Sequence, residues 1–219
     1  MMSKRSFGVL VLIVVAGVLG VLAANKLLGP SGAPHAPWPA TQAVTLLPTP
    51  RPLPEFSLRQ SDGTQLTQGE LRGHWTLVFL GFTFCPDVCP TTLAQLAQAQ
   101  KQWAGLPEST RPRVLFVSVD PERDTPIKTG EYAHAFHKDT LAATADVPAL
   151  EAFAKSLSLL FVKVPGERFK DNPQDYSMDH SAQIVVLDPQ ARMAGIIQPP
   201  FAPAPIAADL LKLTRATTP

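Results

Sequence analysis

Few residues in this sequence can carry metal, redox or nucleophilic chemistry, and its charges are nearly balanced. Only 2 of the 219 residues are cysteine and 5 are histidine. Two cysteines exclude a small fold held together by several disulfides. Nineteen basic residues stand against 18 acidic ones, giving a net charge of +1 at pH 7. Because no basic excess is present, we expect no nucleic-acid partner.

The N-terminal part of the chain combines basic residues with a long apolar run. Residues 7–24 carry no charge and approach the roughly 20 apolar residues that a membrane-spanning helix needs. Lys4 and Arg5 precede the run and only Lys26 lies just beyond it, which predicts a cytoplasmic N-terminus. We expect residues 1–28 to be a single-pass anchor in the cell (inner) membrane, with the C-terminal domain on the extracytoplasmic, periplasmic side. A cleaved signal peptide is the alternative.

The rest of the sequence divides into a linker and one domain. Residues 29–53 are rich in proline, alanine and glycine and show no apolar periodicity, which predicts an extended linker. Residues 54–219 are the expected domain, which is long enough to bury one core. No internal repeat is present in it.

Apolar runs alternate with helical patterns along the domain. Runs at residues 76–83 and 114–119 predict strands that are buried on both faces. Further strands are expected at 159–164, 182–187 and 192–197, and helices after Pro90, from Thr125 to about 137, from 146 to about 158, and at 206–214. This alternation is typical of an α/β sandwich around a mixed sheet. A strand that leads through a two-cysteine turn into a helix is the thioredoxin-like arrangement.

Cys85 and Cys89 lie in that turn, within the sequence FCPDVCP. A structural disulfide between them would close a very short loop and add little stability. As a redox pair they would use the helix N-terminus, which favours a reactive thiolate. As a metal pair they would offer soft ligands to Cu(I) or Zn(II). A thiol peroxidase is disfavoured, because no arginine lies near the turn in the sequence.

His180 is the histidine best placed to join the cysteines. It lies in the polar segment YSMDHS, residues 176–181, directly before an expected strand, and we expect this segment to be a loop, where site residues are common. An ordinary loop histidine is the alternative. A Cys2His donor set suits copper better than magnesium or calcium. Asp179 is either a partner that tunes the histidine or a surface charge. His134 and His137 are interpreted as solvated helix residues.

Three blocks of the sequence resemble the Sco/SenC family: GFTFCPDVCPTTL at 81–93, VLFVSVDPERDTP at 114–126, and YSMDHS followed by LDP at 187–189. The similarity extends from about residue 54 to about 213. Members of this family are membrane-anchored, thioredoxin-like copper proteins that assist assembly of cytochrome c oxidase. The resemblance implies that Cys85, Cys89 and His180 are copper ligands. It places Asp179 at the acidic position beside the histidine.

The resemblance also implies a function. It indicates a chaperone that binds copper, as Cu(I) or Cu(II), and delivers it to cytochrome c oxidase or prepares the oxidase copper site. The expected partner is the copper-site subunit of the oxidase, together with other copper carriers or a thiol reductant. The alternative is a membrane-tethered thiol–disulfide oxidoreductase that acts on a partner's cysteines. A histidine within bonding reach of the sulfurs favours copper, whereas a thiol pair remote from His180 with one exposed sulfur favours the oxidoreductase.

Overall fold

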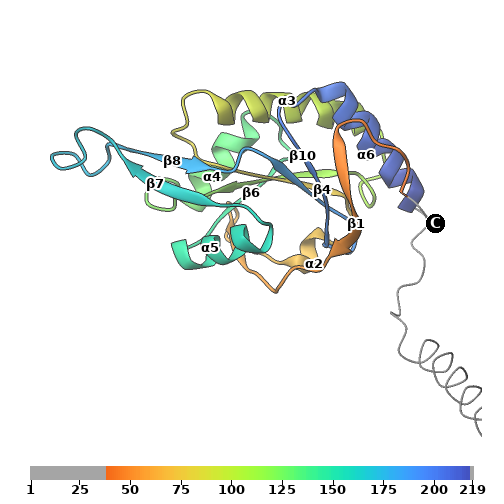
Figure 1. The fold of residues 1–219 in the computed structure, drawn as a ribbon, viewed down its shortest axis with the longest axis horizontal. Coiled ribbons are helices and arrows are strands. Elements are labelled where there is room, and N and C mark those ends of the chain that lie inside the picture. The colour runs from red at the N-terminus through yellow and green to blue at the C-terminus, as the bar shows by residue number, and fades with distance from the viewer. Residues whose placement is uncertain (1–37, 218–219) are drawn as a thin grey trace, which may run out of the picture. The chain divides into compact units, whose positions relative to one another are not determined.

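The computed structural model describes residues 38–217, which fold around a mixed eight-stranded sheet (Figure 1). Parallel pairing joins β4 to β5 and β5 to β6, and the other neighbouring strands are antiparallel. The predicted α/β class with a mixed sheet is confirmed. The strand order is β1 (Val44–Arg51), β10 (Met193–Ile197), β9 (Ile184–Leu187), β4 (Thr76–Gly81), β5 (Arg113–Ser118), β6 (Leu141–Thr144), β2 (Leu58–Gln60) and β3 (Gln65–Leu66).

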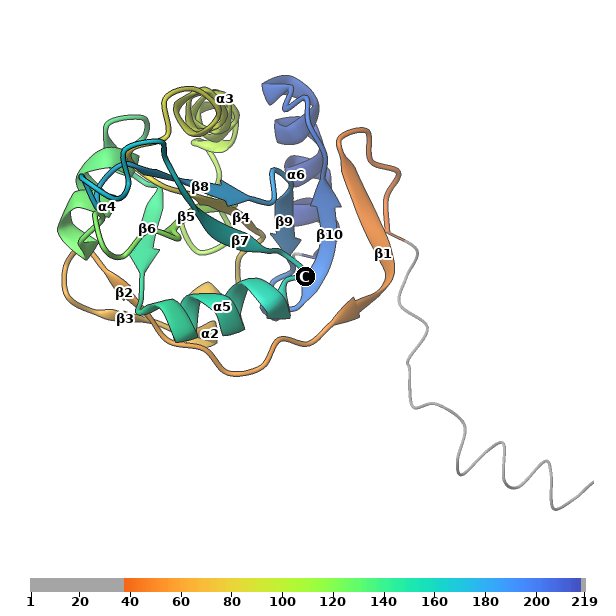
Figure 2. The same cartoon turned by 60° about the vertical axis from the view of Figure 1, so that its left-hand side comes forward.

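Helices cover both faces of this sheet. One face carries α3 and α6, which lie side by side, and the opposite face carries α5 and α2 (Figures 1 and 2). Because both faces are covered, every side chain of β4 is buried, as expected for a continuous apolar run. The helices are α2 (Gln68–Leu71), α3 (Val88–Trp103), α4 (Pro126–His134), α5 (Val147–Ser156) and α6 (Pro203–Thr217).

The segment expected to be a linker contributes a strand. Within residues 29–53, β1 pairs antiparallel with β10, with Val44 opposite Ile197, so the linker prediction is wrong from Val44 onward. Pro48 and Pro50 lie in β1. Such prolines are tolerated because β1 is at the edge of the sheet, where a missing N–H breaks no interior ladder.

A second, two-stranded sheet projects from one end of the domain (Figure 1). It pairs β7 (Phe161–Pro165) antiparallel with β8 (Tyr176–His180), and Phe161 lies opposite His180. The loop predicted for residues 176–181 is therefore wrong over β8. In this strand Tyr176 and Met178 are buried, whereas Ser177 and Asp179 are exposed. Alternate residues of a strand face opposite sides, so this pattern arises because one side of β8 packs against the core.

The apolar run at residues 7–24 lies outside the residues that the structure describes. Among the helices of residues 38–217, none has both the length and the apolar character needed to span a bilayer.

Candidate metal centre

The two cysteines lie where β4 passes into α3. Residues 82–87 form the turn, and α3 begins at Val88. Cys85 is half-buried in the turn, Cys89 is fully buried in the first turn of the helix, and both are free thiols. The backbone N–H of Cys89 donates to Cys85 Sγ at 3.4 Å. A backbone donor at a helix start stabilises negative charge on the sulfur that accepts it.

Cys89 is enclosed by the sheet. A Cβ atom added to Gly81 at the end of β4 would lie 2.9 Å from Cys89 Sγ and 2.7 Å from a ring carbon of Phe116. Only glycine allows this close approach of the sulfur to the strand. Burial raises the pKa of the Cys89 thiol, so the metal-free site holds Cys89 in its protonated form at neutral pH.

His180 lies at the end of β8 and approaches the cysteines from a distant part of the sequence. Its Nε2 lies 3.6 Å from Cys89 Sγ, and its Nδ1 lies 3.2 Å from the carbonyl oxygen of Ser181. Because a carbonyl can only accept, Nδ1 carries the proton and the Nε2 lone pair faces the sulfur. The rings of Phe79 and Phe82 meet the imidazole edge-on, at centroid distances of 5.9 and 6.2 Å.

Burial lowers the pKa of His180, opposed in part by the Ser181 carbonyl and the Asp179 charge. The imidazole is therefore neutral at neutral pH, which is the form that binds a metal. Asp179 is exposed and opposite Val162 in the strand pair. It acts on His180 through its charge, whereas the hydrogen bond that orients the ring comes from Ser181.

The structure brings together two of the three predicted ligands, Cys89 and His180, and places the third, Cys85, in the adjoining turn. Within residues 38–217, no group of three or more His, Cys, Asp and Glu side chains already has an arrangement that could hold a metal ion. The Cys85 Sγ instead accepts the hydrogen bond from the Cys89 backbone N–H. Of the other histidines, His74 contacts the Arg111 carbonyl and His137 accepts from a backbone N–H.

The loop after β5 is hydrogen-bonded to the cysteine turn. No pattern in the sequence predicted this contact. Asp124 is fully buried and accepts hydrogen bonds from Thr83 N–H at 2.8 Å, Thr83 Oγ1 at 2.5 Å and Ser118 Oγ at 2.6 Å. Lys128 Nζ lies 3.3 Å from the same carboxylate. Asp124 therefore ties the start of the turn to the end of β5.

Replacing Asp124 with alanine is expected to lower the free energy of unfolding by about 3 kcal/mol, because each buried donor left unpaired costs about 1–3 kcal/mol. Urea denaturation of the full-length protein measures this. Asp146→Ala is the control: Asp146 is an exposed cap that accepts one hydrogen bond, from the N–H of Ala149, and its loss should cost about 1 kcal/mol. Equal losses in the two variants would contradict the role given to Asp124.

An arginine does lie beside the cysteine turn in space. Arg123 Cζ is 4.8 Å from the centre of the Phe84 ring, and Phe84 directly precedes Cys85. Arg123 is thus far from the cysteine turn in the sequence but close to it in space. The sequence distance therefore does not count against a thiol peroxidase. The guanidinium is paired with Asp120 at 2.5 Å. In the sequence, Arg123 is marked only by its position within the block VLFVSVDPERDTP.

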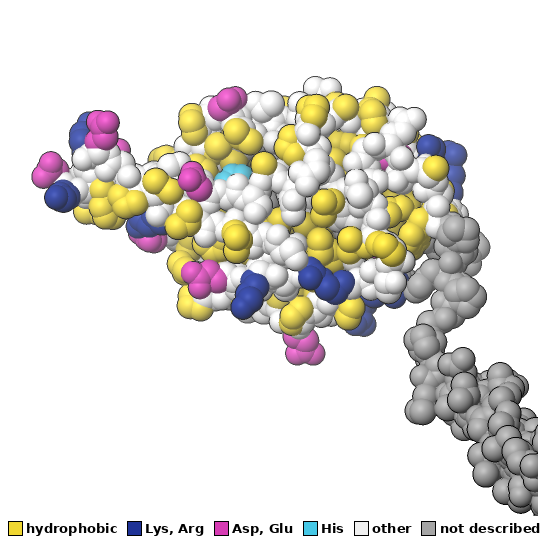
Figure 3. Space-filling view, viewed as in Figure 1, with side chains coloured by type: hydrophobic (Ala, Val, Ile, Leu, Met, Phe, Trp, Pro, Cys, Tyr) yellow, Lys and Arg dark blue, Asp and Glu magenta, His cyan; other side chains and the backbone are white. Residues whose placement is uncertain are grey.

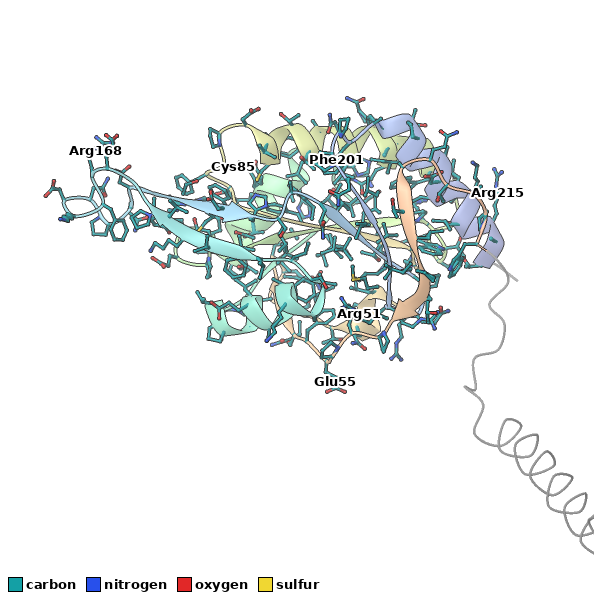
Figure 4. All side chains as sticks on the ribbon, viewed as in Figure 1. Arg51, Glu55, Cys85, Arg168, Phe201 and Arg215 are labelled. Carbon is teal, nitrogen blue, oxygen red and sulfur yellow. The ribbon has the colours of Figure 1, made fainter. Side chains whose placement is uncertain are left out.

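Exposed apolar side chains surround the candidate site. Phe84 is 54% exposed and Val88 49%, on either side of Cys85, and Leu160 is 75% exposed. Leu160 exchanges hydrogen bonds with Ser181, the residue after His180. Figure 3 shows hydrophobic side chains beside a histidine on the face in view. Figure 4 shows Cys85 toward the end of the domain from which β7 and β8 project. Such exposed apolar groups are typical of protein interaction surfaces.

Comparison with known proteins finds one family. A model of the SCO1/SenC family matches residues 47–215. "Protein SCO2 homolog, mitochondrial" of Bos taurus is 36% identical over 135 residues, which are 62% of this chain and 49% of that protein. A "Putative copper-binding protein" of Stutzerimonas stutzeri is 31% identical over 160 residues, 72% of this chain and 74% of that protein. The match thus spans about half the length of the bovine relative.

Solved structures of similar proteins confirm the predicted thioredoxin-like α/β fold. The solution structure of apo Sco1 from Thermus thermophilus has a TM-score of 0.68 and 34% identity, and the match covers 83% of this chain and 99% of that one. Bradyrhizobium japonicum ScoI with copper bound has a TM-score of 0.65 and 31% identity, covering 74% and 98%. Arabidopsis thaliana ScoI, also with copper bound, has a TM-score of 0.66 and 29% identity, covering 74% and 98%.

Proposed function

Because the chain belongs to the SCO1/SenC family, we propose that it is a copper chaperone that delivers copper to cytochrome c oxidase or prepares the oxidase copper site. The observation that carries this proposal is the approach of His180 Nε2 to Cys89 Sγ at 3.6 Å, with the ring already oriented by Ser181. Structures of two similar proteins contain copper. We further propose that residues 1–28 anchor the chain in the inner membrane, with its domain on the periplasmic side.

The donor atoms fit copper as a cargo. Two thiolates and one imidazole form a soft, low-coordinate set that holds Cu(I) well. Cys89 and His180 supply two donors that already face each other, and rotation of the Cys85 side chain away from the Cys89 N–H would supply the third. Metal binding must displace the proton of the buried Cys89 thiol. The hydrogen bond from Nδ1 to Ser181 keeps Nε2 available throughout.

Transfer to a partner would occur at Cys85, the less buried sulfur. A copper ion with three ligands accepts a further sulfur or imidazole from a partner, so that copper passes by ligand exchange without being released. The exposed side chains of Phe84, Val88 and Leu160 would pack against that partner and exclude water from the exchange.

A second candidate function is favoured by the unequal burial of the two free thiols. In a thiol–disulfide oxidoreductase, the Cys85 thiolate would attack a partner's disulfide and form a mixed disulfide, releasing one partner thiolate. Cys89, after losing its proton, would then attack Cys85 Sγ and release the second partner thiolate. Two electrons pass to the partner, whose thiolates take up the protons, and a Cys85–Cys89 disulfide remains on this chain.

Reduced full-length protein is expected to bind one Cu(I) per chain, with an affinity that falls at least about tenfold for each unit that the pH is lowered. The sign follows from Cys89: burial raises the pKa of its thiol, so below that pKa copper must release a proton, and acid opposes release. The lowered pKa of His180 means that its imidazole competes for protons only in more acidic solution than usual. Titration against a Cu(I) chelator between about pH 6 and pH 8 measures both quantities.

The same preparation distinguishes the two functions. Stoichiometric Cu(I) binding by the wild-type chain, together with a Cu(II) affinity that falls in His180→Ala, supports the chaperone. Copper bound far below one equivalent, together with reduction of a disulfide substrate at a rate that His180→Ala leaves unchanged, would assign the protein to the oxidoreductases instead.

A further inference from the structure

One loop of the fold contacts both halves of the candidate site. It connects β5 to α4 and contains Asp120 and Arg123. We propose that Arg123, held by Asp120, is a positioning residue that sets β8, and with it His180, against the cysteine turn. This inference rests on the copper-binding function proposed above, because it explains how ligands from two distant segments are kept in register.

On the β8 side, Arg123 contacts both the backbone and the ring of Tyr176. Its Nη1 donates to the carbonyl oxygens of Tyr176 at 3.0 Å and Gln174 at 3.3 Å, and its Cζ lies 3.6 Å from the centre of the Tyr176 ring. Tyr176 Oη in turn donates to Asp120 Oδ1 at 2.7 Å. Tyr176 begins β8 and His180 ends it, and alternate residues of a strand share a face. A shift of Tyr176 would therefore carry His180 with it.

On the turn side, the guanidinium lies against aromatic residues that adjoin the ligands. Its Cζ is 4.8 Å from the centre of the Phe84 ring and 5.9 Å from that of Phe82. Phe84 is covalently next to Cys85, and the Phe82 ring meets the His180 ring edge-on. Arg123 thus stacks between the cysteine turn and the strand that bears the histidine.

The chemistry of the Arg123–Asp120 ion pair is better suited to positioning β8 than to stabilising the fold. The side chains of Arg123 and Asp120 are 7% and 2% exposed, with Nε and Oδ2 2.5 Å apart. Buried ion pairs cost much of their attraction in lost hydration, and their best-attested use is to fix one geometry. Within the described residues, Arg123 Nη2 is buried without a hydrogen-bond partner, a cost that a purely stabilising arrangement would avoid. Lysine could keep the charge but not the planar fork.

The chain offers a matched control at the β9–β10 turn. There Arg192 Nε donates to Asp188 Oδ2 at 2.7 Å, and Asp188 is fully buried. The pair repeats the arginine–aspartate chemistry, and its contacts lie within its own turn. Arg192→Lys therefore reports what loss of such a pair does to the fold, and Arg123→Lys reports that cost plus any effect on the ligands.

Arg123→Lys in the full-length protein is expected to weaken binding of Cu(II), the ion that depends most on His180, by about 10–100-fold, the usual loss when a residue that supports a ligand is replaced. Arg192→Lys should change the affinity less than about twofold. In the metal-free protein, hydrogen exchange of the β8 amides should be faster in Arg123→Lys than in Arg192→Lys. The Cu(II)–thiolate absorption should also shift in the first variant alone.

Equal affinity losses in the two lysine variants, or none in either, would overturn the proposal. If Arg123→Lys does not fold, Tyr176→Phe is the second test: it removes only the hydroxyl that contacts Asp120 and should weaken copper binding in the same direction, by a smaller factor. If the wild-type chain binds no copper, the proposed function fails, and the exchange measurement on metal-free protein still decides whether Arg123 positions β8.

Discussion

Oxidation of Cys85 and Cys89 to a disulfide is expected to weaken Cu(I) binding by at least about 1,000-fold, or ~4 kcal/mol. The new bond removes both anionic donors and leaves only the His180 imidazole. The cysteines are four residues apart, with Cys85 Sγ already 3.4 Å from the Cys89 nitrogen, so the turn brings the two residues together. Competition titration of the oxidised and the reduced full-length protein against the same chelator measures the difference.

Reversal by a thiol reductant is the control for this experiment. Copper binding should return in full, since a thiol reductant gives back the two electrons and two protons that disulfide formation removes. Equal affinities of the oxidised and reduced forms would contradict the link between redox state and copper loading. Such a link means that a thiol reductant in the same compartment would control how much copper the chain carries.

Replacement of His180 by alanine is expected to weaken Cu(II) binding by at least about 100-fold and Cu(I) binding much less. Two thiolates still satisfy a soft Cu(I) ion, whereas Cu(II) depends more on the imidazole nitrogen. Loss of the ring also removes the edge contacts with Phe79 and Phe82. Titration with each ion, together with the Cu(II) absorption spectrum, separates the two effects.

Asp179→Asn is the matched control for this variant. Asp179 precedes His180 in β8, is exposed, and acts on the imidazole through charge alone. Its replacement should therefore lower the Cu(II) affinity by less than about tenfold. That is the lower end of the losses seen when a residue that supports a ligand by a hydrogen bond is replaced. A Cu(II) spectrum that is unchanged in His180→Ala would remove His180 from the site.

The amino-acid sequence by itself determined the features that depend on neighbouring residues. The runs at 76–83 and 114–119 are predominantly apolar, which was enough to predict strands covered on both faces. The apolar segments at 182–187 and 192–197 were enough to predict two strands, which are β9 and β10. The spacing of Cys85 and Cys89 ahead of a helical pattern placed both sulfurs at a helix start, because that relation is local to the chain.

Only the tertiary structure decided which distant segments meet. The sequence of β1 contains prolines, as a linker would, and this segment is a strand because β10 pairs with it. In β8, buried and exposed side chains alternate because other segments supply the core against which one side of the strand packs. Cys89 and His180 are 91 residues apart, and Arg123 joins Phe84 to Tyr176 from a third segment. Such contacts depend on how the two sheets and the loop between β5 and α4 pack together, and no local pattern in the sequence predicts which distant residues will meet.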